Sequence, residues 1–585
     1  MINFANHFSM LTICRLIIKT FHLDRNCNNM KKILIAIASC LAIMTLGAKT
    51  STTRSSKADI SRNLQIFNAI YKELQTNYVD TIDADATMQT AIRAMLSTID
   101  PYTEYYPADN QDEITSISAG QYAGIGSVIM KRDNGVMIHR PQWNTPSRNA
   151  GVRHGDVILS IDDWEVTPDA DVTEVSKRLR GQAGTHVTVN VKRPYVEDSL
   201  LSFDIVRGAI KVDPLPWYGM LDDSIGFIKL TTFNESSAEA VKDAVIALKA
   251  NSGLKGIVLD LRDNGGGLLE SAVQIVGNFV DKGTEVVRTK YNDSTNVKVY
   301  RTPKKPIDTK IPLAVLINEG TASAAEIVSG SLQDLDRAVV IGQRSYGKGL
   351  VQNTRPIPFD GLFKVTVARY YIPSGRLIQA IDYSHRDENG RVTRIPDSLT
   401  TVFQTKHGRE VRDGGGITPD VKVAVPDGNR LLYNIVGDFW SFDFANKYAA
   451  LHDSASVEDP TEFVVTDTVF EEFKKFIDPD KFKYDRLCES GIKYLRDAAK
   501  VEGYMNDSVA AEFDRLEAML KHDLNHDLDF NREAIVEILD AEIADRYFSD
   551  GELVRRTVSR GDAEVDSARA ILSDRVRYKT ILNQK

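Results

Sequence analysis

Apolar residues recur at helical spacing through the region from residue 58 to residue 110. They stand three or four positions apart, which places them on one face of a helix. The pattern ends at Asp100-Pro101, where the proline disfavours helical backbone in the residue before it. We therefore predict a helical N-terminal region over 58–110. Its apolar positions are Leu64, Phe67, Ile70, Tyr71, Leu74, Met88, Ala91, Ile92, Met95 and Leu96.

Short apolar runs punctuated by glycine follow between residues 118 and 208. Runs of this length and β-branched content predict strands. One stretch, 172–179, has helical spacing instead. We predict a small β domain over 118–208, with strands at 128–130, 136–138, 157–161 and 187–191.

Between residues 209 and 425 the chain alternates between fully apolar runs and helical patterns. This alternation predicts a parallel or mixed sheet with covering helices, because parallel strands are joined by crossover connections. The predicted strands are 225–230, 256–261, 312–317 and 338–341, and the predicted helices are 238–250, 268–280 and 323–335.

The segment 428–585 is helical and charged, and we interpret it as an accessory domain. The acidic stretch 522–529 resembles a calcium loop in outline but lacks the glycine at position six and the acid at position twelve, so a solvated turn is predicted. Taken together, the four regions predict a multidomain α+β protein. The predicted elements of the last segment are helices near 469–477, 492–501, 508–521 and 531–545 and one short strand at 463–467.

Charge and composition exclude some partners. The net charge of −9 is spread along the 585 residues and no basic cluster interrupts it, so nucleic acid is not an expected partner. Hydrophobic residues at 42% and charged residues at 26% are ordinary for a globular protein, so neither disorder nor a membrane-embedded chain is indicated.

The N-terminus has the order of a secretory signal. Lys31 and Lys32 precede an apolar run over 33–46, followed by small residues. We predict a leader over 1–48 and, in a bacterium with two membranes, a periplasmic protein. Met30 directly precedes this signal, so an upstream start that makes 1–29 an artefact stays open. Two alternatives also stay open: an uncleaved leader that associates with the membrane, and a lipoprotein.

Cysteine usage argues against thiol chemistry. Only Cys488 would remain once the leader is removed, so no intramolecular disulfide is expected, and we predict that Cys488 is buried. Neither His-Glu-x-x-His nor a paired-cysteine motif occurs, and we predict no metal and no cofactor. The cysteines in the leader are Cys14, Cys27 and Cys40.

Two segments carry the candidate chemistry. An apolar run ends at Ile317, and Ser323 then stands where a helix would begin, a position that favours developing negative charge. Lys348 lies 25 residues later in a glycine-bracketed turn. A serine nucleophile needs a base, and a lysine serves when burial lowers its pKa. A helix cap at Ser323 and an exposed turn at Lys348 are the alternatives.

Several motifs in one order resemble the carboxy-terminal processing peptidases, or tail-specific proteases, of the S41 serine-peptidase family. The resemblance covers about residues 64 to 425. Its motifs are Ile99-Asp-Pro-Tyr-Thr103, the loop 122–126, the stretch 150–159, Asp260-Leu-Arg-Asp-Asn-Gly-Gly-Gly267, the Ser323 and Lys348 segments, and Arg369-Tyr-Tyr-Ile-Pro-Ser-Gly-Arg376.

The resemblance implies a ClpP/crotonase-like protease core at 209–425 and a catalytic dyad of Ser323 and Lys348, with Gln352 orienting the lysine. Gly266 and Ala324 would supply the oxyanion-hole N–H groups. The family often has proline at the position of Gly265, which leaves open which glycine amide is the donor. We interpret Arg262 as a structural pairing residue.

The β domain resembles a PDZ domain, and the resemblance implies that it binds the apolar C-terminal tails of protein substrates. The expected function is an exported serine endopeptidase acting through an acyl-enzyme. A non-catalytic tail-binding scaffold is the alternative, and an adaptor or activator protein is a further expected kind of partner. The expected carboxylate-binding loop is Tyr122, Ala123, Gly124, Ile125 and Gly126.

Overall fold

A computed structural model describes residues 57–108, 120–197, 199–293, 295–388, 390–424, 429–452, 459–484 and 486–584. The chain divides into two compact units, Met1–Ala91 and Ile92–Lys585. The predicted leader over 1–48, with its three cysteines, lies outside the described residues.

The described part of the first unit is helical. Helix α3 (Lys57–Asn77) has no buried residue, and the Tyr71 hydroxyl donates to the Ala84 carbonyl at the start of α4 (Ala84–Ser97) at 2.6 Å. The region 58–110, predicted to be helical, thus contains these two helices, whereas residues 104–106 near its end form a strand. The apolar positions Leu64 and Ile70 are nonetheless exposed.

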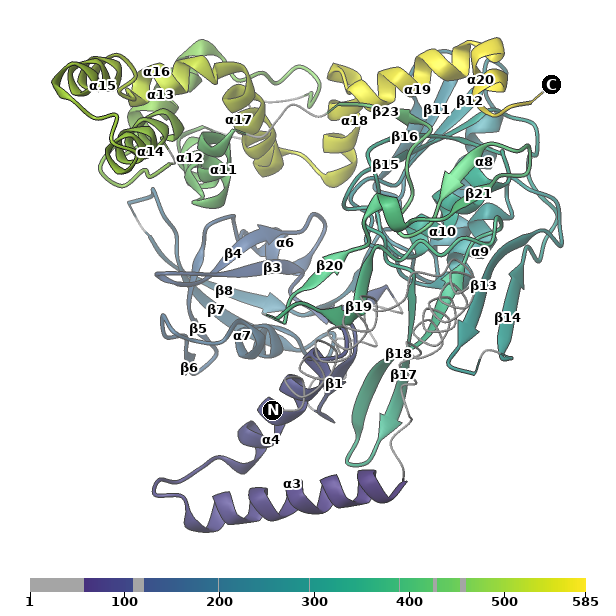
Figure 1. The fold of residues 1–585 in the computed structure, drawn as a ribbon, viewed down its shortest axis with the longest axis horizontal. Helices are drawn as coiled ribbons and strands as arrows, with labels where there is room; N and C mark the ends of the chain where they lie inside the picture. Colours follow the sequence, from purple (N-terminus) through teal and green to yellow (C-terminus); the bar gives the residue numbers. More distant parts are fainter. Residues whose placement is uncertain are drawn as a thin grey trace, which may run out of the picture. The chain divides into compact units, whose positions relative to one another are not determined.

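The predicted β domain contains an antiparallel sheet in the order β3-β4-β5-β7-β8, with β6 added on β5 (Figure 1). Alternate residues of the central strand β7 point into the core, which is why Val187, Val189 and Val191 are buried. The elements are β2 (Gln121–Gly124), β3 (Ser127–Arg132), β4 (Gly135–Pro141), α6 (Pro146–Ala150), β5 (Val157–Ile161), β6 (Trp164–Glu165), α7 (Val172–Leu179), β7 (His186–Lys192), β8 (Leu200–Val206) and β9 (Gly208–Lys211), which pairs with β2.

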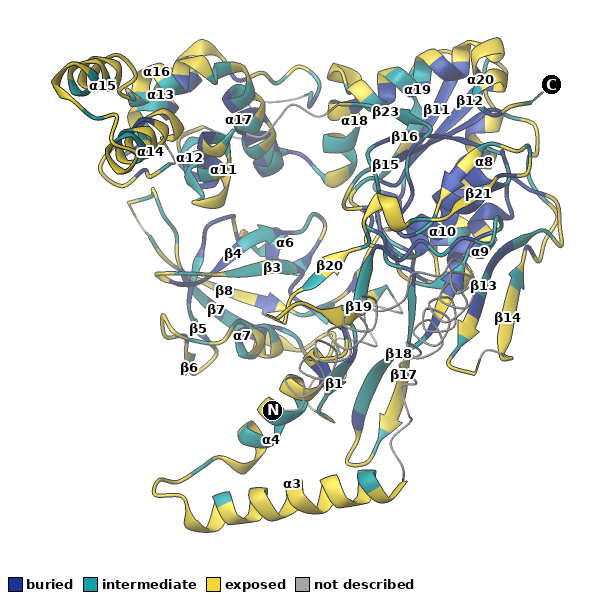
Figure 2. Cartoon of the chain, in the orientation of Figure 1, coloured by how far each residue is buried: buried dark blue, intermediate teal, exposed yellow. Residues whose placement is uncertain are grey.

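A six-stranded sheet, β10-β11-β12-β15-β16-β23, forms the centre of the predicted protease core. All its pairs are parallel except β10 with β11. Every residue of β12 and β15 is buried (Figure 2), since helices cover both faces. The elements are β10 (Trp217–Met220), β11 (Ile225–Lys229), α8 (Ser237–Lys249), β12 (Gly256–Asp260), α9 (Leu269–Val276), β15 (Leu313–Ile317), α10 (Ala324–Asp334), β16 (Val339–Gly342) and β23 (Val421–Lys422).

The two faces of this sheet are covered by different parts of the chain. Helices α8, α9 and α10 share one apolar core with one face. The other face packs against the C-terminal helices α18 (Asp550–Arg560), α19 (Ala563–Ser573) and α20 (Arg575–Ile581), shown in yellow in Figure 1. Apolar contacts there join Phe227 and Leu316 of the sheet to Val565 and Ile571 of α19.

The preceding helices form a separate apolar core of their own. The segment 428–585, predicted as one accessory domain, is thus divided between two cores. The amphipathic pattern of a helix indicates that one face is covered but does not indicate by what. The helices with side chains in this core are α11 (Arg430–Gly437), α12 (Trp440–Leu451), α13 (Asp467–Phe476), α16 (Leu524–Phe530) and α17 (Arg532–Tyr547). Helices α14 (Leu487–Val501) and α15 (Asp507–Met519) follow α13 in the chain, and no described residue of theirs belongs to this core.

Three local predictions in this segment are wrong. The strand predicted at 463–467 is irregular chain leading into α13. The predicted acidic turn is largely helix α16, whose N-cap Asp523 accepts from the His526 N–H. Cys488 is exposed, because α14 buries only Ile492 and covers too little surface to enclose the thiol.

A second sheet, β1-β18-β13-β14 with β17 on β18, lies beside the core and carries the segment after Lys348. Among the described residues, no helix has the length and apolar content needed to cross a membrane. The remaining strands are β1 (Glu104–Tyr106), β13 (Glu285–Tyr291), β14 (Val297–Arg301), β17 (Leu350–Ile357), β18 (Gly361–Tyr371), β19 (Ile381–Arg386), β20 (Val392–Arg394), β21 (Val402–Gln404) and β22 (Glu410–Arg412).

Candidate active site

Ser323 stands between the end of β15 and the first turn of α10. Its φ of +56° and ψ of −117° are unfavourable for a residue with a side chain. Such strain costs about 1–3 kcal/mol and persists only where the surroundings enforce it. One constraint is the glycine loop, because a Cβ added to Gly266 would lie 2.8 Å from the Ser323 Cβ. The loop is therefore packed directly against the candidate nucleophile.

The carboxylate of Glu326 connects the two candidate catalytic segments. One oxygen accepts the Ser345 hydroxyl at 2.5 Å and the Gly347 N–H at 2.7 Å. The other accepts the Ser323 N–H at 2.9 Å and the Lys348 N–H at 2.8 Å. Burial raises the pKa of Glu326, although all four hydrogen bonds oppose the shift. A single buried side chain thus fixes the backbones of Ser323 and Lys348 relative to each other.

A buried tyrosine adds a second connection. The Tyr370 hydroxyl lies 2.6 Å from the Lys348 carbonyl oxygen and 3.1 Å from the Ser323 carbonyl oxygen. Tyr370 is 1% exposed, and burial raises its pKa well above the ordinary value, so the hydroxyl stays protonated as a donor. The backbones of the two candidate residues, Ser323 and Lys348, are therefore held by side chains of the core.

The side chain of Lys348 lies against an aromatic ring. Its Nζ is 4.2 Å from the centroid of Tyr102. Burial, and then the positive charge of Lys364, lower the pKa of Lys348, while Glu326 and more distant carboxylates oppose the shift. Within the described part of the chain, no carboxylate oxygen lies within 4.0 Å of this ammonium. The pKa thus moves in the direction that a lysine base requires.

Gln352 lies on β17, four residues after Lys348. Its Nε2 donates to the Thr366 hydroxyl of the adjacent strand β18 at 3.2 Å. The structure therefore places Gln352 near the dyad, hydrogen-bonded to Thr366 rather than to the lysine amine.

The glycine loop offers several backbone amides. The Gly266 N–H donates to the Asn264 side chain at 2.9 Å, so this expected oxyanion donor is already engaged. Among the described residues, the Gly265 and Ala324 N–H groups have no acceptor. A Cβ at Gly265 would meet nothing within 4 Å. Of the two neighbouring glycine amides, that of Gly265 is thus the freer, and the oxyanion roles of Ala324 and the glycine loop stay predictions.

A cavity of about 760 Å³ joins these groups. Its wall combines the predicted site residues with apolar side chains, including Phe233, Leu268 and Ile327, and with the charged Lys298 and Lys364. It is large enough for several residues of an extended peptide. The predicted site residues on its wall are Ser323, Lys348, Gln352, Gly266 and Ala324.

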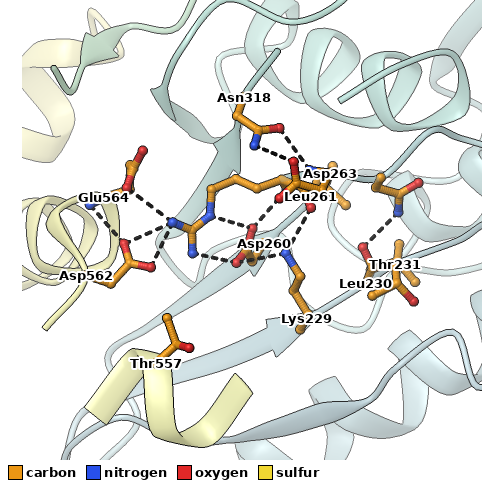
Figure 3. Close-up of polar contacts among 12 residues, drawn as sticks. Lys229, Leu230, Thr231, Asp260, Leu261, Asp263, Asn318, Thr557, Asp562 and Glu564 are labelled. Atoms are coloured by element: carbon orange, nitrogen blue, oxygen red, sulfur yellow. Dashed lines mark hydrogen bonds and ion pairs between the residues drawn. The ribbon is translucent and has the colours of Figure 1, made fainter. Parts of the chain in front are cut away.

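Arg262, the residue before the glycine loop, is enclosed by three acidic side chains, Asp260, Asp562 and Glu564, which are labelled in Figure 3. Asp260 binds its Nε at 3.0 Å and its Nη2 at 2.7 Å. Nη1 binds Asp562 at 2.8 Å and Glu564 at 3.2 Å, both at the start of α19. These pairs support the interpretation of Arg262 as a structural residue.

The loop at 122–126 forms one end of a groove between β3 and α7. Strand β3 pairs only with β4 and is thus an edge of its sheet. Among the described residues, the Ile125 and Gly126 N–H groups have no acceptor. The groove contains a cavity of about 60 Å³, lined by Tyr122, Ile125, Gly126, Ser127, Ile129, Ser176, Leu179 and Arg180. Ala123 and Gly124 belong to β2 and pair with β9.

Three family models match this chain. Peptidase family S41 matches residues 224–384, a PDZ domain matches residues 123–206, and the C-terminal helical domain of a probable PDZ-protease matches residues 431–572. The "Carboxy-terminal-processing protease" of Bartonella bacilliformis is 33% identical over 351 residues, which cover 59% of this chain and 79% of that protein. The chain belongs to the carboxy-terminal-processing protease family.

Two further similar proteins match comparable shares of the chain. The "Carboxy-terminal processing protease CtpA" of Bacillus subtilis is 32% identical over 334 residues, covering 57% of this chain and 69% of that protein. The solved "Photosystem II D1 C-terminal processing protease" is 27% identical, with a TM-score of 0.36, and covers 61% of this chain and 86% of that one.

Membership makes this protein a serine-type peptidase with a PDZ domain, and it confirms the predicted family and the multidomain α+β fold. The roles of individual site residues stay predictions. The sequence analysis did not single out Glu326, three residues after Ser323, or Tyr370, although Tyr370 lies in the quoted motif 369–376. A signal for Glu326 was present, because Ser323 followed three residues later by Glu is a capping-box pattern. No comparable pattern singles out Tyr370.

Proposed function

We propose that this carboxy-terminal-processing protease is an exported endopeptidase that captures apolar C-terminal tails of proteins through its PDZ domain. It cleaves peptide bonds in the 760 Å³ cavity with Ser323 as nucleophile and Lys348 as base. The observation that carries this proposal is the Glu326 carboxylate, which hydrogen-bonds the backbones of both residues beside a cavity that both line.

The chemistry follows from the lowered pKa of Lys348. The neutral amine takes the proton of the Ser323 hydroxyl as the serine oxygen attacks the peptide carbonyl carbon. The Ala324 N–H and an amide of the glycine loop stabilise the resulting oxyanion. Collapse of the tetrahedral intermediate breaks the C–N bond, and the Lys348 ammonium protonates the leaving amine. Lys348 then takes a proton from water as the water oxygen attacks the acyl carbon, and it returns this proton to the Ser323 oxygen as the ester C–O bond breaks and the acid product leaves.

The PDZ groove suits a free, small C-terminal residue. The open edge of β3 offers main-chain pairing to an extended peptide. The two unpaired amides of Ile125 and Gly126 point to a carboxylate, because successive N–H groups form an anion nest. The apolar lining by Ile129 and Leu179 favours an apolar terminal side chain, and the groove cavity of about 60 Å³ favours a short one.

Catalysis is tested by cleavage of an unfolded protein that bears an apolar tail. We expect Ser323→Ala and Lys348→Ala to lose at least about 10³-fold in kcat, as expected for removal of a nucleophile or its base. Lys348→Arg keeps the charge but cannot act as a base, so it should be equally inactive. Lys282→Ala, an exposed lysine of the same core, is the matched control and should retain activity. Full activity of Ser323→Ala would refute the proposed dyad, whereas tail binding without cleavage by the wild type would favour a scaffold.

Tail capture has its own matched pair of variants. Gly126→Ala places a Cβ 2.4 Å from the Thr145 Cβ, at a φ of +78°. Gly184→Ala has the same kind of backbone strain, at a φ of +89°, but its Cβ meets nothing within 4 Å. Because only Gly126→Ala creates a clash in the groove, only this variant should raise the KM for a tail-bearing substrate. Replacing the tail carboxylate of the substrate by a carboxamide should have the same effect on the wild type. Equal KM values for both tails would refute carboxylate recognition.

Export rests on the leader over 1–48 and not on the described residues. N-terminal sequencing of the mature protein from cell fractions tests it. A mature chain that starts near residue 49 in the soluble periplasmic fraction is expected. A chain that retains the leader in the membrane fraction would indicate an anchored enzyme instead.

A further inference from the structure

The C-terminal helix α19 reaches the glycine loop of the active site from the opposite face of the core sheet. Asp562, its N-cap residue, and Glu564 in its first turn both bind Arg262 Nη1 (Figure 3). All three side chains are at most 15% exposed. Arg262 immediately precedes Asp263, where the glycine loop begins.

The start of the loop is held tightly on both sides. The Lys229 ammonium donates to the Arg262 carbonyl at 2.9 Å. Asp263 has a strained φ of +60°, and its N–H and carboxylate form two hydrogen bonds with the Asn318 side chain, at 2.9 and 2.8 Å. Arg262 and Asp263 are thus the residues through which side-chain contacts hold the start of the loop.

The other end of the loop meets the nucleophile. Gly266 lies so close to Ser323 that a Cβ would clash with its Cβ and with the Ala324 nitrogen, at 2.8 and 2.9 Å. Glu564 also accepts from the Gln343 side chain at 3.0 Å, in the segment that leads to Lys348. The start of α19 thus contacts both the residue before the glycine loop and the segment that leads to Lys348.

We propose that Asp562 and Glu564 are positioning residues that hold Arg262, and through it the glycine loop, where its amides can stabilise the oxyanion. The C-terminal helix is then part of the catalytic apparatus and not only a cover of the sheet. This inference rests on the proposed Ser323 mechanism. It predicts an effect on stabilisation of the tetrahedral intermediate and not on ground-state binding of substrate.

The test is the double variant Asp562→Asn/Glu564→Gln in the full-length protein. Asparagine is as good an N-cap as aspartate, so the helix should remain formed while Arg262 loses two of its three carboxylates. Asp566→Asn is the matched control, because Asp566 is an exposed acid of the same helix that pairs with Arg569 on the surface. All measurements are made well below the melting temperature of each variant.

We expect the double variant to lower kcat by at least about tenfold with KM within about twofold, since sub-ångström misplacement of catalytic groups is costly. Affinity for a peptide aldehyde, which forms a tetrahedral adduct with serine, should fall by the same factor, while affinity for the corresponding peptide amide stays constant. The pH midpoint of the rate should not move, because the surroundings of Lys348 are unchanged.

Three results would overturn the inference: a kcat within twofold of wild type, a loss of kcat shared by Asp566→Asn, or a displaced pH midpoint, which would place the effect on Lys348 instead. A wild type that is no more active than Ser323→Ala would instead refute the proposed function. The two failures are thus distinguishable in one set of proteins.

Discussion

Replacement of Glu326 by glutamine tests most sharply how the dyad is held. The carboxylate accepts four hydrogen bonds, two on each oxygen. In Glu326→Gln one oxygen becomes an amide nitrogen, which cannot accept, so two buried donors lose their acceptor. Bonds to a charged acceptor contribute about 1.5–3 kcal/mol each, which gives a gross loss of roughly 3–6 kcal/mol. Burial disfavours the charged form of Glu326 and so raises the pKa of its carboxyl group. Because the substitution removes this unfavourable buried charge, we expect a net loss at the low end of the range.

A loss of about 3 kcal/mol in the positioning of the dyad corresponds to about 10²-fold in kcat. The assay is cleavage of an unfolded tail-bearing protein, with thermal unfolding measured on the same samples. Asp334→Asn is the matched control: Asp334 is a buried carboxylate of the same helix α10, with a pKa also raised by burial, but it binds Arg376 and Ser374 rather than the dyad.

Both variants should unfold at lower temperature than wild type. Only Glu326→Gln should lose kcat when both proteins are folded, and Asp334→Asn should remain within about threefold of wild type. Equal kcat values for the two variants would show that Glu326 acts on global stability alone and would refute the positioning argument.

Three further predictions concern charge, exposure and the C-terminal helices. The positive charge of Lys364 lowers the pKa of Lys348, so Lys364→Met should raise that pKa, move the rising limb of the pH–rate profile to higher pH and slow cleavage at pH 7. The control is Lys298→Met, in the same cavity, which should leave the midpoint of the profile unchanged. An unmoved profile in Lys364→Met would contradict the electrostatic argument. Cys488 should react with a maleimide in the native protein without loss of activity, and protection until denaturation would show that it is buried. Tyr578→Phe removes a buried hydroxyl that accepts the main-chain N–H of Leu313 in β15 at 3.0 Å. It should lower the free energy of unfolding by about 1–2 kcal/mol in denaturant unfolding. An unchanged denaturation midpoint would contradict the docking of α20.

The sequence predicted best the elements that are buried on both faces. Strands β12 and β15 read as unbroken apolar runs because helices cover both sides, and the helix after Ser323 was placed to within a residue of α10. The glycines of the loop 264–267 permit a close approach of backbones. The structure gives the reason, since a Cβ at Gly267 would lie 2.1 Å from the Phe233 carbonyl oxygen.

Contacts between distant segments could not be predicted in the same way. Helices α14 and α19 have similar charged, amphipathic patterns, yet α14 buries only Ile492 whereas α19 completes the core. The role of Glu326 likewise depends on Ser345 and Lys348, about twenty residues away, and no local pattern specifies that distance. The partners that Arg262 finds near the end of the chain are likewise set by the assembled fold and not by any local pattern.

The central claim, that Ser323 attacks the substrate with Lys348 as its base, is tested most directly by trapping the acyl-enzyme. A tail-bearing peptide ester is mixed with wild type and with Lys348→Arg, the reaction is quenched in acid, and the acylated residue is mapped by mass spectrometry. The account predicts an adduct on Ser323 in the wild type that accumulates faster as pH rises and is suppressed in Lys348→Arg. An adduct on another residue, or acylation of Ser323 at the wild-type rate in Lys348→Arg, would contradict it.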